Sequence, residues 1–444
     1  MNNNQYKNIA SSLIKLPVLD VMVDKLTAID PSPLINTVVV YIHHALGTSL
    51  NLLDAIFSLG LVPSNTFVLG KHYSENREVV QEIKKLKVHE QSCSTQVGLG
   101  RFDENFTNDI QGLWSQVVRH LEINTHIENV LILDHGGYAI NFTPDSIYQN
   151  FKVVGLEKTS GGLMKLDRQG YLSSFPLINM ANCAAKKIIE SPLIAMAVLG
   201  KLSSVIPIDR KMICGVIGYG AIGKAIVDKL HLLGHKVIIC DHDPAQLEMI
   251  NLHDNFLATT DIVTTIASSE LIFGCSGQDI TRSTEVFRLA THDKTLISCS
   301  SGDSEFLTLL QLIQKNNHQG LIKNPLMDQI YKSELGGKIK ILRGGFPYNF
   351  DGSGESVPAQ DIQLTRALVL SGIFQAIDFF KNPNVLSKKG LYALDADLQK
   401  FVVREWLQYQ PKKRHSEEMR LNFENIDWIK DNSPGIQEKL RFKL

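Results

Sequence analysis

A glycine-rich turn in this chain has the residue types and the spacing that can bind a dinucleotide. Gly218, Gly220 and Gly223 follow the apolar run Met212–Ile217 and open a helical pattern. The first glycine permits a tight turn, the second lets backbone N–H groups approach a pyrophosphate, and the third lets helix and strand pack closely. We therefore expect a cofactor-binding turn made of Gly218, Gly220, Ala221, Ile222 and Gly223.

The next predicted strand, Lys236–Cys240, is followed by an acidic residue, Asp241. A carboxylate in this position can accept hydrogen bonds from the two hydroxyl groups of an adenosine ribose, and it would repel the 2′-phosphate of NADP. The expected cofactor is therefore NAD. A glycine-rich turn of the same shape that binds no nucleotide is the alternative interpretation.

Charged side chains also stand at the ends of other predicted elements. Asp134 closes the apolar strand Asn129–Asp134. At the carboxyl end of a parallel sheet such a carboxylate is a candidate acid or base for a substrate C–H or leaving group, with a turn or a helix cap as the alternative. Lys186 and Glu190 are four residues apart on one predicted helix face, where they form either part of a catalytic site or a simple exposed ion pair.

Two further polar residues follow β-branched runs. His43 comes after the strand Val38–Ile42, and Glu157 comes after the short strand Lys152–Gly155. A histidine in this place often merely ends a buried strand with a polar group, and His44 beside it is equally placed.

The elements that must position these residues alternate along the chain. Short β-branched runs and amphipathic segments follow one another from Thr37–Ile42 onward, and a second series begins with Met212–Ile217. This alternation predicts βαβ units and parallel sheets. The expected fold class is α/β, with two α/β domains around a cleft, one of them a Rossmann NAD-binding domain. Two long helices, Asp361–Phe380 and Asp395–Leu407, are expected near the C-terminal end.

The composition is that of an ordinary globular protein. The 444 residues include 45 Lys and Arg against 46 Asp and Glu, which gives a formal net charge of −1. This balance provides no electrostatic footprint for nucleic acid or a membrane surface, and no run approaches the roughly 18 apolar residues of a membrane-spanning helix. The six cysteines and 14 histidines show no metal-ligand spacing, so no metal is expected. We expect a cytoplasmic protein that acts on a small molecule.

The segment from Gly215 to Pro244, GVIGYGAIGKAIVDKLHLLGHKVIICDHDP, is similar to the cofactor-binding segment of the S-adenosylhomocysteine hydrolase family. Further stretches resemble motifs of that family in the family's order and at near-family spacing. They are LILDHGG at Leu131–Gly137, GLEKTSG at Gly155–Gly161, the stretch from Ile178 through Lys186 to Glu190, CSGQDI at Cys275–Ile280, and GLYALDADL at Gly390–Leu398. The resemblance spans about residues 35–410 and identifies the chain as a divergent member.

The resemblance implies an unusual use of a tightly bound NAD. Members of that family oxidise a ribose 3′-hydroxyl to a ketone, which acidifies the neighbouring C–H; a thiol is then eliminated, water is added, and the ketone is reduced again. By this resemblance Lys186 and Glu190 face the sugar, and Lys186 assists deprotonation of its hydroxyl. Glu157 matches a carboxylate that holds ribose hydroxyls, and His43 matches a histidine of proton transfer. The resemblance also places two residues at the cofactor, Ser276 and Asn349.

Motifs that recognise the base and lock the cofactor are altered. The family's adenine-binding threonine is Ala45 here, and a nearby glutamine is Gly47. The loop Tyr348–Pro358 keeps Asn349 but lacks the family's histidine, and the family's C-terminal lysine–tyrosine motif is absent. A site without its base donors and acceptors loses several kcal/mol of binding to that base, so these losses predict an altered specificity.

The expected function is that of an NAD-dependent, adenosylhomocysteinase-like enzyme that oxidises a secondary hydroxyl of a nucleoside-like or polyol-like substrate. The elimination and reduction of the family either follow, or NADH leaves and the protein is a plain dehydrogenase. Authentic S-adenosylhomocysteine hydrolysis is one alternative, and an NAD-binding, catalytically silent regulatory relative is another.

The expected domains follow from the same resemblance. A discontinuous substrate-binding domain comprises residues 1–190 and 352–410, the Rossmann domain comprises 191–351, and residues 411–444 form a C-terminal tail. A homo-oligomer, either a dimer or a tetramer, is expected because the family forms one.

Overall fold

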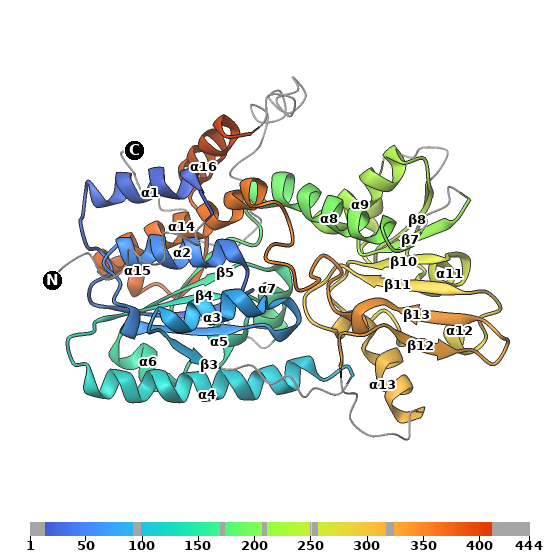
Figure 1. Ribbon diagram of the computed structural model, residues 1–444, viewed down its shortest axis with the longest axis horizontal. Coiled ribbons are helices and arrows are strands. Elements are labelled where there is room, and N and C mark those ends of the chain that lie inside the picture. The colour runs from blue at the N-terminus through green and yellow to red at the C-terminus, as the bar shows by residue number, and fades with distance from the viewer. Residues whose placement is uncertain are drawn as a thin grey trace. The chain divides into compact units, whose positions relative to one another are not determined.

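The computed structural model describes residues 14–91, 99–168, 174–206, 211–248, 250, 256–316 and 324–410. Contacts between Cα atoms divide the chain into two compact units (Figure 1). Unit 1 comprises Met1–Cys93, Asn108–Glu190 and Gly352–Leu444, and unit 2 comprises Ser94–Thr107 and Ser191–Asp351. The expected tail, 411–444, lies outside the described residues.

Unit 1 is built on a seven-stranded sheet with the order β14-β6-β5-β4-β1-β2-β3, in which every pairing is parallel. All seven residues of β1 are buried, which explains why its sequence TVVVYIH is apolar on both faces. The strands are β1 (Thr37–His43), β2 (Thr66–Gly70), β3 (His89–Gln91), β4 (Asn129–Asp134), β5 (Lys152–Glu157), β6 (Pro176–Asn179) and β14 (Gly390–Ala393).

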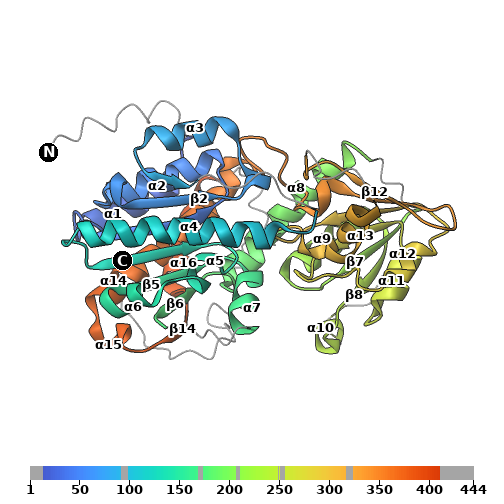
Figure 2. The same ribbon diagram turned by 90° about the horizontal axis from the view of Figure 1, so that it is seen from below.

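Helices cover both faces of this sheet. Figures 1 and 2 show α4 along one face, whereas α1, α2 and α14 lie along the other. The helix α14 packs on β5 so closely that a Cβ on Gly372 would lie 2.7 Å from Cδ1 of Leu156. The helices are α1 (Pro17–Thr27), α2 (Gly47–Ser58), α3 (Arg77–Lys85), α4 (Phe102–Ile123), α5 (Tyr138–Asn141), α6 (Asp145–Asn150), α7 (Ser160–Arg168), α14 (Ala359–Lys381), α15 (Pro383–Leu386) and α16 (Ala396–Gln408).

Unit 2 contains a second seven-stranded sheet, with the order β12-β13-β11-β10-β7-β8-β9. All its pairings are parallel except that of β12 with β13. The strands are β7 (Ile213–Ile217), β8 (Lys236–Cys240), β9 (Phe256–Thr259), β10 (Leu271–Gly274), β11 (Lys294–Ser298), β12 (Gln329–Lys332) and β13 (Lys338–Ile341). The strand order reverses between β7 and β10, which is the switch point at which such sheets bind ligands.

Separate apolar clusters lie on the two faces of this second sheet. One cluster is formed with α8 and α9, and the other with α11, α12 and α13. The helices of unit 2 are α8 (Ser191–Ser203), α9 (Ala221–Leu232), α10 (Pro244–Glu248), α11 (Ile262–Ser268), α12 (Glu285–Arg288) and α13 (Leu307–Asn316). Unit 2 is thus a doubly wound Rossmann-type domain, and the prediction of an α/β fold with such a domain is confirmed.

The first turns of α4 belong to unit 2, although the sequence analysis places all residues up to 190 in one domain. Phe102 explains this assignment, because its ring lies 5.8 Å from that of Phe346, edge to face. Its backbone N–H also donates to the buried carboxyl group of Asp303. Both contacts lie within unit 2.

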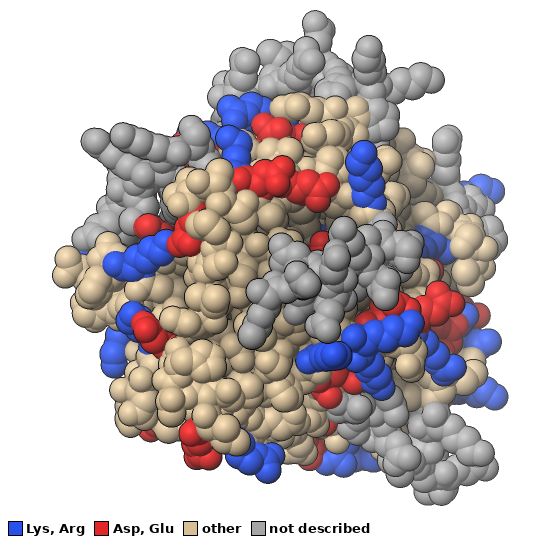
Figure 3. All heavy atoms as spheres, turned by 60° about the vertical axis from the view of Figure 1, so that its left-hand side comes forward, with Lys and Arg blue, Asp and Glu red and all other residues tan. Residues whose placement is uncertain are grey.

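The surface of the described residues carries mixed charges. On the face shown in Figure 3, basic and acidic side chains are interspersed among uncharged ones. Within the described ranges, no helix combines the length and the apolar character needed to cross a membrane.

Candidate active site and cofactor site

The glycine-rich turn joins β7 to α9 in unit 2. Gly218 has a φ of +98°, which glycine adopts without strain. A Cβ on Gly223 would lie 1.8 Å from the carbonyl oxygen of Gly218, so folding itself demands a glycine there. A Cβ on Gly220 would meet no heavy atom within 4 Å. The second glycine therefore borders open space at the N-terminus of α9, whose first turn begins with Ala221 and Ile222, and this space fits a pyrophosphate.

Asp241 lies at the carboxyl end of β8, beside this turn. Its carboxylate accepts the backbone N–H of Tyr219 at 2.6 Å and that of Asp243 at 2.9 Å, and the residue is 8% exposed. These bonds fix the carboxylate next to the second glycine. The position is the one expected for a residue that holds ribose hydroxyls.

Ser276 follows β10 and is held by a buried acid that the sequence analysis did not single out. Its backbone N–H and its Oγ donate to Oε1 of Glu305 at 2.9 and 2.7 Å. Glu305 is fully buried, and burial raises the pKa of its carboxyl group. Asn349 is also buried in unit 2, where its carbonyl oxygen accepts a hydrogen bond from Nζ of Lys201 at 2.7 Å.

In unit 1 the candidate catalytic residues stand at the carboxyl ends of neighbouring strands. Asp134 at the end of β4 is directly opposite Glu157 at the end of β5, and Glu157 is opposite Asn179 at the end of β6. His43 ends β1 and is opposite Gly70 of β2. The topology thus brings together, at one sheet edge, residues that are more than 130 positions apart in the chain.

The carboxylates of Asp134 and Glu157 are both fully buried and accept backbone hydrogen bonds. Asp134 accepts from the N–H groups of His135 and Ile140 at 2.7 and 2.8 Å. Glu157 accepts from the backbone N–H groups of Gly136 at 3.0 Å and Gly137 at 2.9 Å. It also accepts from the backbone N–H and the hydroxyl group of Thr159. Burial, and next the charge of Glu157, raise the pKa of Asp134. Both side chains therefore brace the loop His135–Gly137, which is called the glycine loop below.

Lys186 and Glu190 lie on a π-helical turn that immediately precedes α8. Nζ of Lys186 is 2.7 Å from Oε1 of Glu190, and the two side chains are 19% and 11% exposed. The pair is therefore shielded from water to a degree that an ordinary surface ion pair is not. The lysine charge also helps to lower the pKa of His135, which places the pair beside the glycine loop.

His43 is 2% exposed, and its ring stacks on that of Tyr41 with 4.7 Å between ring centroids. Burial, followed by the charges of Lys158 and Arg366, lowers the pKa of His43 to about 3. The ring is consequently neutral at physiological pH, and its Nδ1 has no hydrogen-bond partner among the described residues.

Two histidines that the sequence analysis did not nominate form a hydrogen-bonded pair. Nε2 of His44 lies 3.1 Å from Nε2 of His135, and Nδ1 of His44 lies 2.5 Å from Oγ of Ser74. Burial, then the charge of Lys71, lowers the pKa of both rings well below the usual value. Both rings are therefore neutral, so one donates to the other and a proton can pass along the pair.

Two buried lysines follow the ends of strands in the same region. Lys71 follows β2 and is fully buried, whereas Lys158 follows β5 and is 6% exposed. The sequence contained one signal for them, a charged residue directly after an apolar strand, in the stretches VLGK and GLEK. Within the described residues, no group of three or more His, Cys, Asp or Glu side chains is arranged to hold a metal ion.

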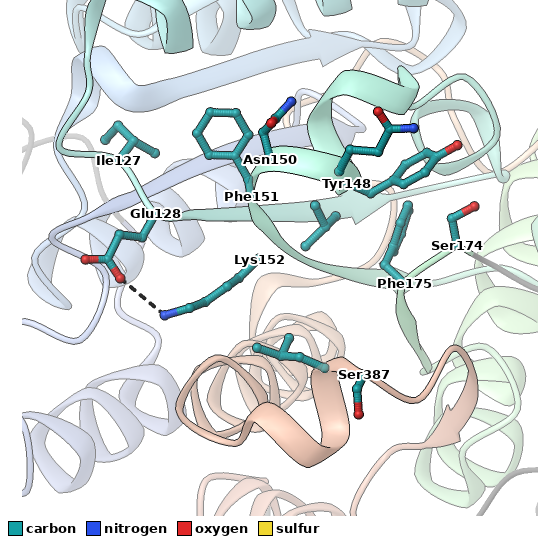
Figure 4. Close-up of a pocket in the computed structure, with 12 residues that line it drawn as sticks. Ile127, Glu128, Tyr148, Asn150, Phe151, Lys152, Ser174, Phe175 and Ser387 are labelled. Carbon is teal, nitrogen blue, oxygen red and sulfur yellow. Dashed lines mark hydrogen bonds and ion pairs between the residues drawn. The ribbon is translucent and has the colours of Figure 1, made fainter.

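A hollow of about 510 Å³ lies at the opposite, amino end of β4 and β5 (Figure 4). It is lined by Tyr148, Phe151 and Phe175 among others, and an ion pair of 3.2 Å between Lys152 and Glu128 borders it. The hollow is separated by the length of the strands from the cluster of ionisable side chains at their carboxyl ends.

Comparison with known proteins gives a family match inside unit 2. Residues 213–302, from β7 to just beyond β11, match a family described as NADP oxidoreductase, coenzyme F420-dependent. Uncharacterized proteins from two strains of Mycobacterium tuberculosis are each 27% identical to this chain over 358 residues, which is 80% of this chain and 67% of theirs.

Solved structures resemble the chain only distantly. The NADPH-dependent glyoxylate/hydroxypyruvate reductase of Sinorhizobium meliloti, in complex with NADP and malonate, is 11% identical with a TM-score of 0.40, over 78% of this chain and 94% of that one. A D-2-hydroxyisocaproate dehydrogenase is 13% identical with a TM-score of 0.29, over 63% of this chain and 75% of that one. Independently of these structures, the sheet order of unit 2 and the family match over residues 213–302 indicate a Rossmann-type fold like that of pyridine-nucleotide oxidoreductases.

Proposed function

We propose that the protein is an NAD-dependent, adenosylhomocysteinase-like enzyme that oxidises a secondary hydroxyl group of a small nucleoside-like or polyol-like substrate. The observation on which this depends is the shielded ion pair of Lys186 with Glu190, beside a sheet edge rich in ionisable groups. An ion pair in full contact with water is common on protein surfaces and contributes little to stability. The Lys186–Glu190 pair is instead sheltered, and this favours a chemical role. The glycine-rich turn of unit 2 provides the second support.

The roles follow from the chemistry of removing a hydride from a carbinol carbon. A bound nicotinamide dinucleotide supplies the hydride acceptor. The hydroxyl proton must leave as the hydride does, and Lys186 would hold that oxygen and stabilise the negative charge that develops on it. Glu190, 2.7 Å away, would hold Lys186 in place.

A second proton transfer is needed if elimination follows the oxidation, because the C–H next to the new carbonyl must lose its proton. Asp134 is held in place by two backbone N–H donors, so we assign it to positioning the glycine loop. His135 would instead accept the proton at Nδ1. The hydroxyl of Ser74 donates to a backbone carbonyl, so Nδ1 of His44 donates to Ser74 and Nε2 of His135 donates to His44, which leaves the lone pair of His135 on Nδ1.

The cofactor proposal is NAD rather than NADP. Asp241 holds a carboxylate beside the turn, and Asp243 adds a second one two residues later. A 2′-phosphate between these carboxylates would be repelled, although the family that matches residues 213–302 is described as NADP oxidoreductase, coenzyme F420-dependent. A direct comparison of the two cofactors therefore tests the proposal.

The experiment starts from the purified full-length protein. The protein is denatured and any released nucleotide is identified by mass, while the absorbance of reduced nicotinamide is followed as candidate substrates are added. Reduction of the nicotinamide on adding S-adenosylhomocysteine or adenosine would favour authentic hydrolysis. Reduction of the nicotinamide on adding another nucleoside or a polyol would favour the proposed enzyme. Bound NAD with no response to any of them would favour the silent relative.

A matched pair of variants tests the role of the lysine. Lys186→Met should slow nicotinamide reduction by at least about a hundredfold, because it removes the group that stabilises the developing charge. Lys187→Met, at the adjacent exposed lysine, is the control and should leave the rate unchanged. Equal rates in the two variants would contradict the proposed role.

A further inference from the structure

Two basic side chains near the carboxyl ends of the strands of unit 1 are buried without an ion-pair partner among the described residues. Lys158 is 6% exposed and Arg366 is 8% exposed. Among the described residues, no carboxylate oxygen of Asp or Glu lies within 4.0 Å of Nζ of Lys158 or of the guanidinium nitrogens of Arg366. Removing a charge from water costs several kcal/mol unless the charge is paired. Burial, followed by the charge of Arg366, lowers the pKa of Lys158 to about 7, so this lysine is only partly charged near neutral pH and a bound anion would favour its charged form. The missing partner requires an explanation.

Both side chains also keep unused hydrogen-bond donors. Nζ of Lys158 donates to the carbonyl oxygen of Ile42 at 2.9 Å, and its other two N–H groups have no acceptor among the described residues. Nε of Arg366 donates to Oγ1 of Thr48 at 3.0 Å, and its four terminal N–H groups have no acceptor among them. Nδ1 of His43 is likewise without a partner.

These groups lie close enough to one another to interact electrostatically. The charges of Lys158 and Arg366 both lower the pKa of His43, and after burial the charge of Arg366 is the main cause that lowers the pKa of Lys158, to about 7. Nζ of Lys158 lies 4.7 Å from the ring centroid of Tyr41, directly below His43 in the strand. Lys71, which directly follows β2, adds a further positive charge.

The nearest acids form no ion pair with these two side chains within the described residues. Oε1 of Glu355 accepts the backbone N–H of Thr48, whereas its Oε2 is buried without a hydrogen-bond partner there, and burial raises the pKa of this carboxyl group. Glu157 precedes Lys158, and its carboxylate accepts backbone hydrogen bonds from the glycine loop. Neither acid therefore neutralises the two cations at contact distance.

We infer that Lys158 and Arg366, with His43 beside them, hold an anionic oxygen-bearing group of the substrate, a phosphate or a carboxylate. Such a group supplies the absent counter-charge and can accept the unused N–H donors of both side chains. The inference deepens the proposed function, on which its interpretation as a substrate site rests: the hydroxylated substrate is a negatively charged molecule.

The test is a calorimetric titration of the full-length protein with inorganic phosphate and, separately, with malonate, at constant ionic strength. The wild-type protein should bind one equivalent of at least one of the two anions. The tighter of the two identifies the group as a phosphate or a carboxylate. Thermal unfolding with and without the same anions gives a second measure that needs no variant.

The variants Lys158→Met and Arg366→Leu should each weaken the binding of that anion at least tenfold, whereas the exposed Lys187→Met should not change it. Absence of binding of both anions to the wild-type protein would overturn the inference, and so would equal affinities in all variants. A parallel titration with NAD separates the two proposals. Anion binding without NAD binding would refute the proposed function alone, and NAD binding without anion binding would refute this inference alone.

Discussion

Replacing the second glycine of the turn with alanine separates cofactor binding from folding. Gly220 has a φ of −72°, which alanine adopts freely, and a Cβ there would meet no heavy atom of the protein within 4 Å. Gly220 is the N-cap of α9, where alanine is less favourable than glycine. The Gly220→Ala variant should therefore lose at most about 1 kcal/mol of unfolding free energy.

The effect on nucleotide binding should be much larger. The methyl group would occupy the space that the pyrophosphate needs in order to reach the N–H groups at the start of α9. Loss of one hydrogen bond to a charged group costs about 1.5–3 kcal/mol. The dissociation constant for NAD should accordingly rise roughly ten- to hundredfold.

The assay combines a calorimetric titration with NAD and a thermal melt of each protein. Gly223→Ala is the contrasting variant, because its Cβ would lie 1.8 Å from the carbonyl oxygen of Gly218 and should destabilise the fold itself. Wild-type affinity for NAD in Gly220→Ala would refute the placement of the pyrophosphate at this turn. A severe loss of stability in Gly220→Ala would refute the claim that its surroundings are open.

Two further predictions concern buried acids. Glu157→Gln should lower the unfolding free energy by about 1–3 kcal/mol in urea denaturation, since the NH2 group in place of Oε2 would face the N–H donor of Gly137. Unchanged stability would contradict the bracing role. Burial raises the pKa of Asp303 to about 7. Between about pH 4 and pH 7 the folded state therefore keeps a proton that the unfolded state has already lost. The free energy of unfolding should consequently fall by up to about 4 kcal/mol as the pH rises through this range. Thermal melts across this range should show a smaller slope for Asp303→Asn, and an equal slope would contradict the assignment.

The cofactor turn could be predicted from the sequence because all its parts are consecutive. The turn Gly218–Gly223 lies between one strand and one helix, and Asp241 ends the very next strand, so a local pattern contains the whole arrangement. The strand ends at Asp134 and Glu157 were also predictable, because polar residues there interrupt apolar runs. The directions of those two carboxylates were not, since they depend on the path of the glycine loop.

The proximity of Lys158 and Arg366 could not be predicted from local patterns. Arg366 lies on α14 and contacts Thr48 at the start of α2, 318 residues away in the sequence. Its meeting with Lys158 depends on the return of α14 to unit 1, where the helix packs against β5. Only the fold shows that both side chains lie near His43, and that neither forms an ion pair with a carboxylate of the described residues.

Binding of NAD by unit 2 is tested most directly by calorimetric titration of the full-length protein with NAD and with NADP. We expect NAD to bind at least tenfold more tightly than NADP, because the carboxylate of Asp241 would accept ribose hydroxyls and repel a 2′-phosphate. Tighter binding of NADP, or binding of neither nucleotide, would contradict it.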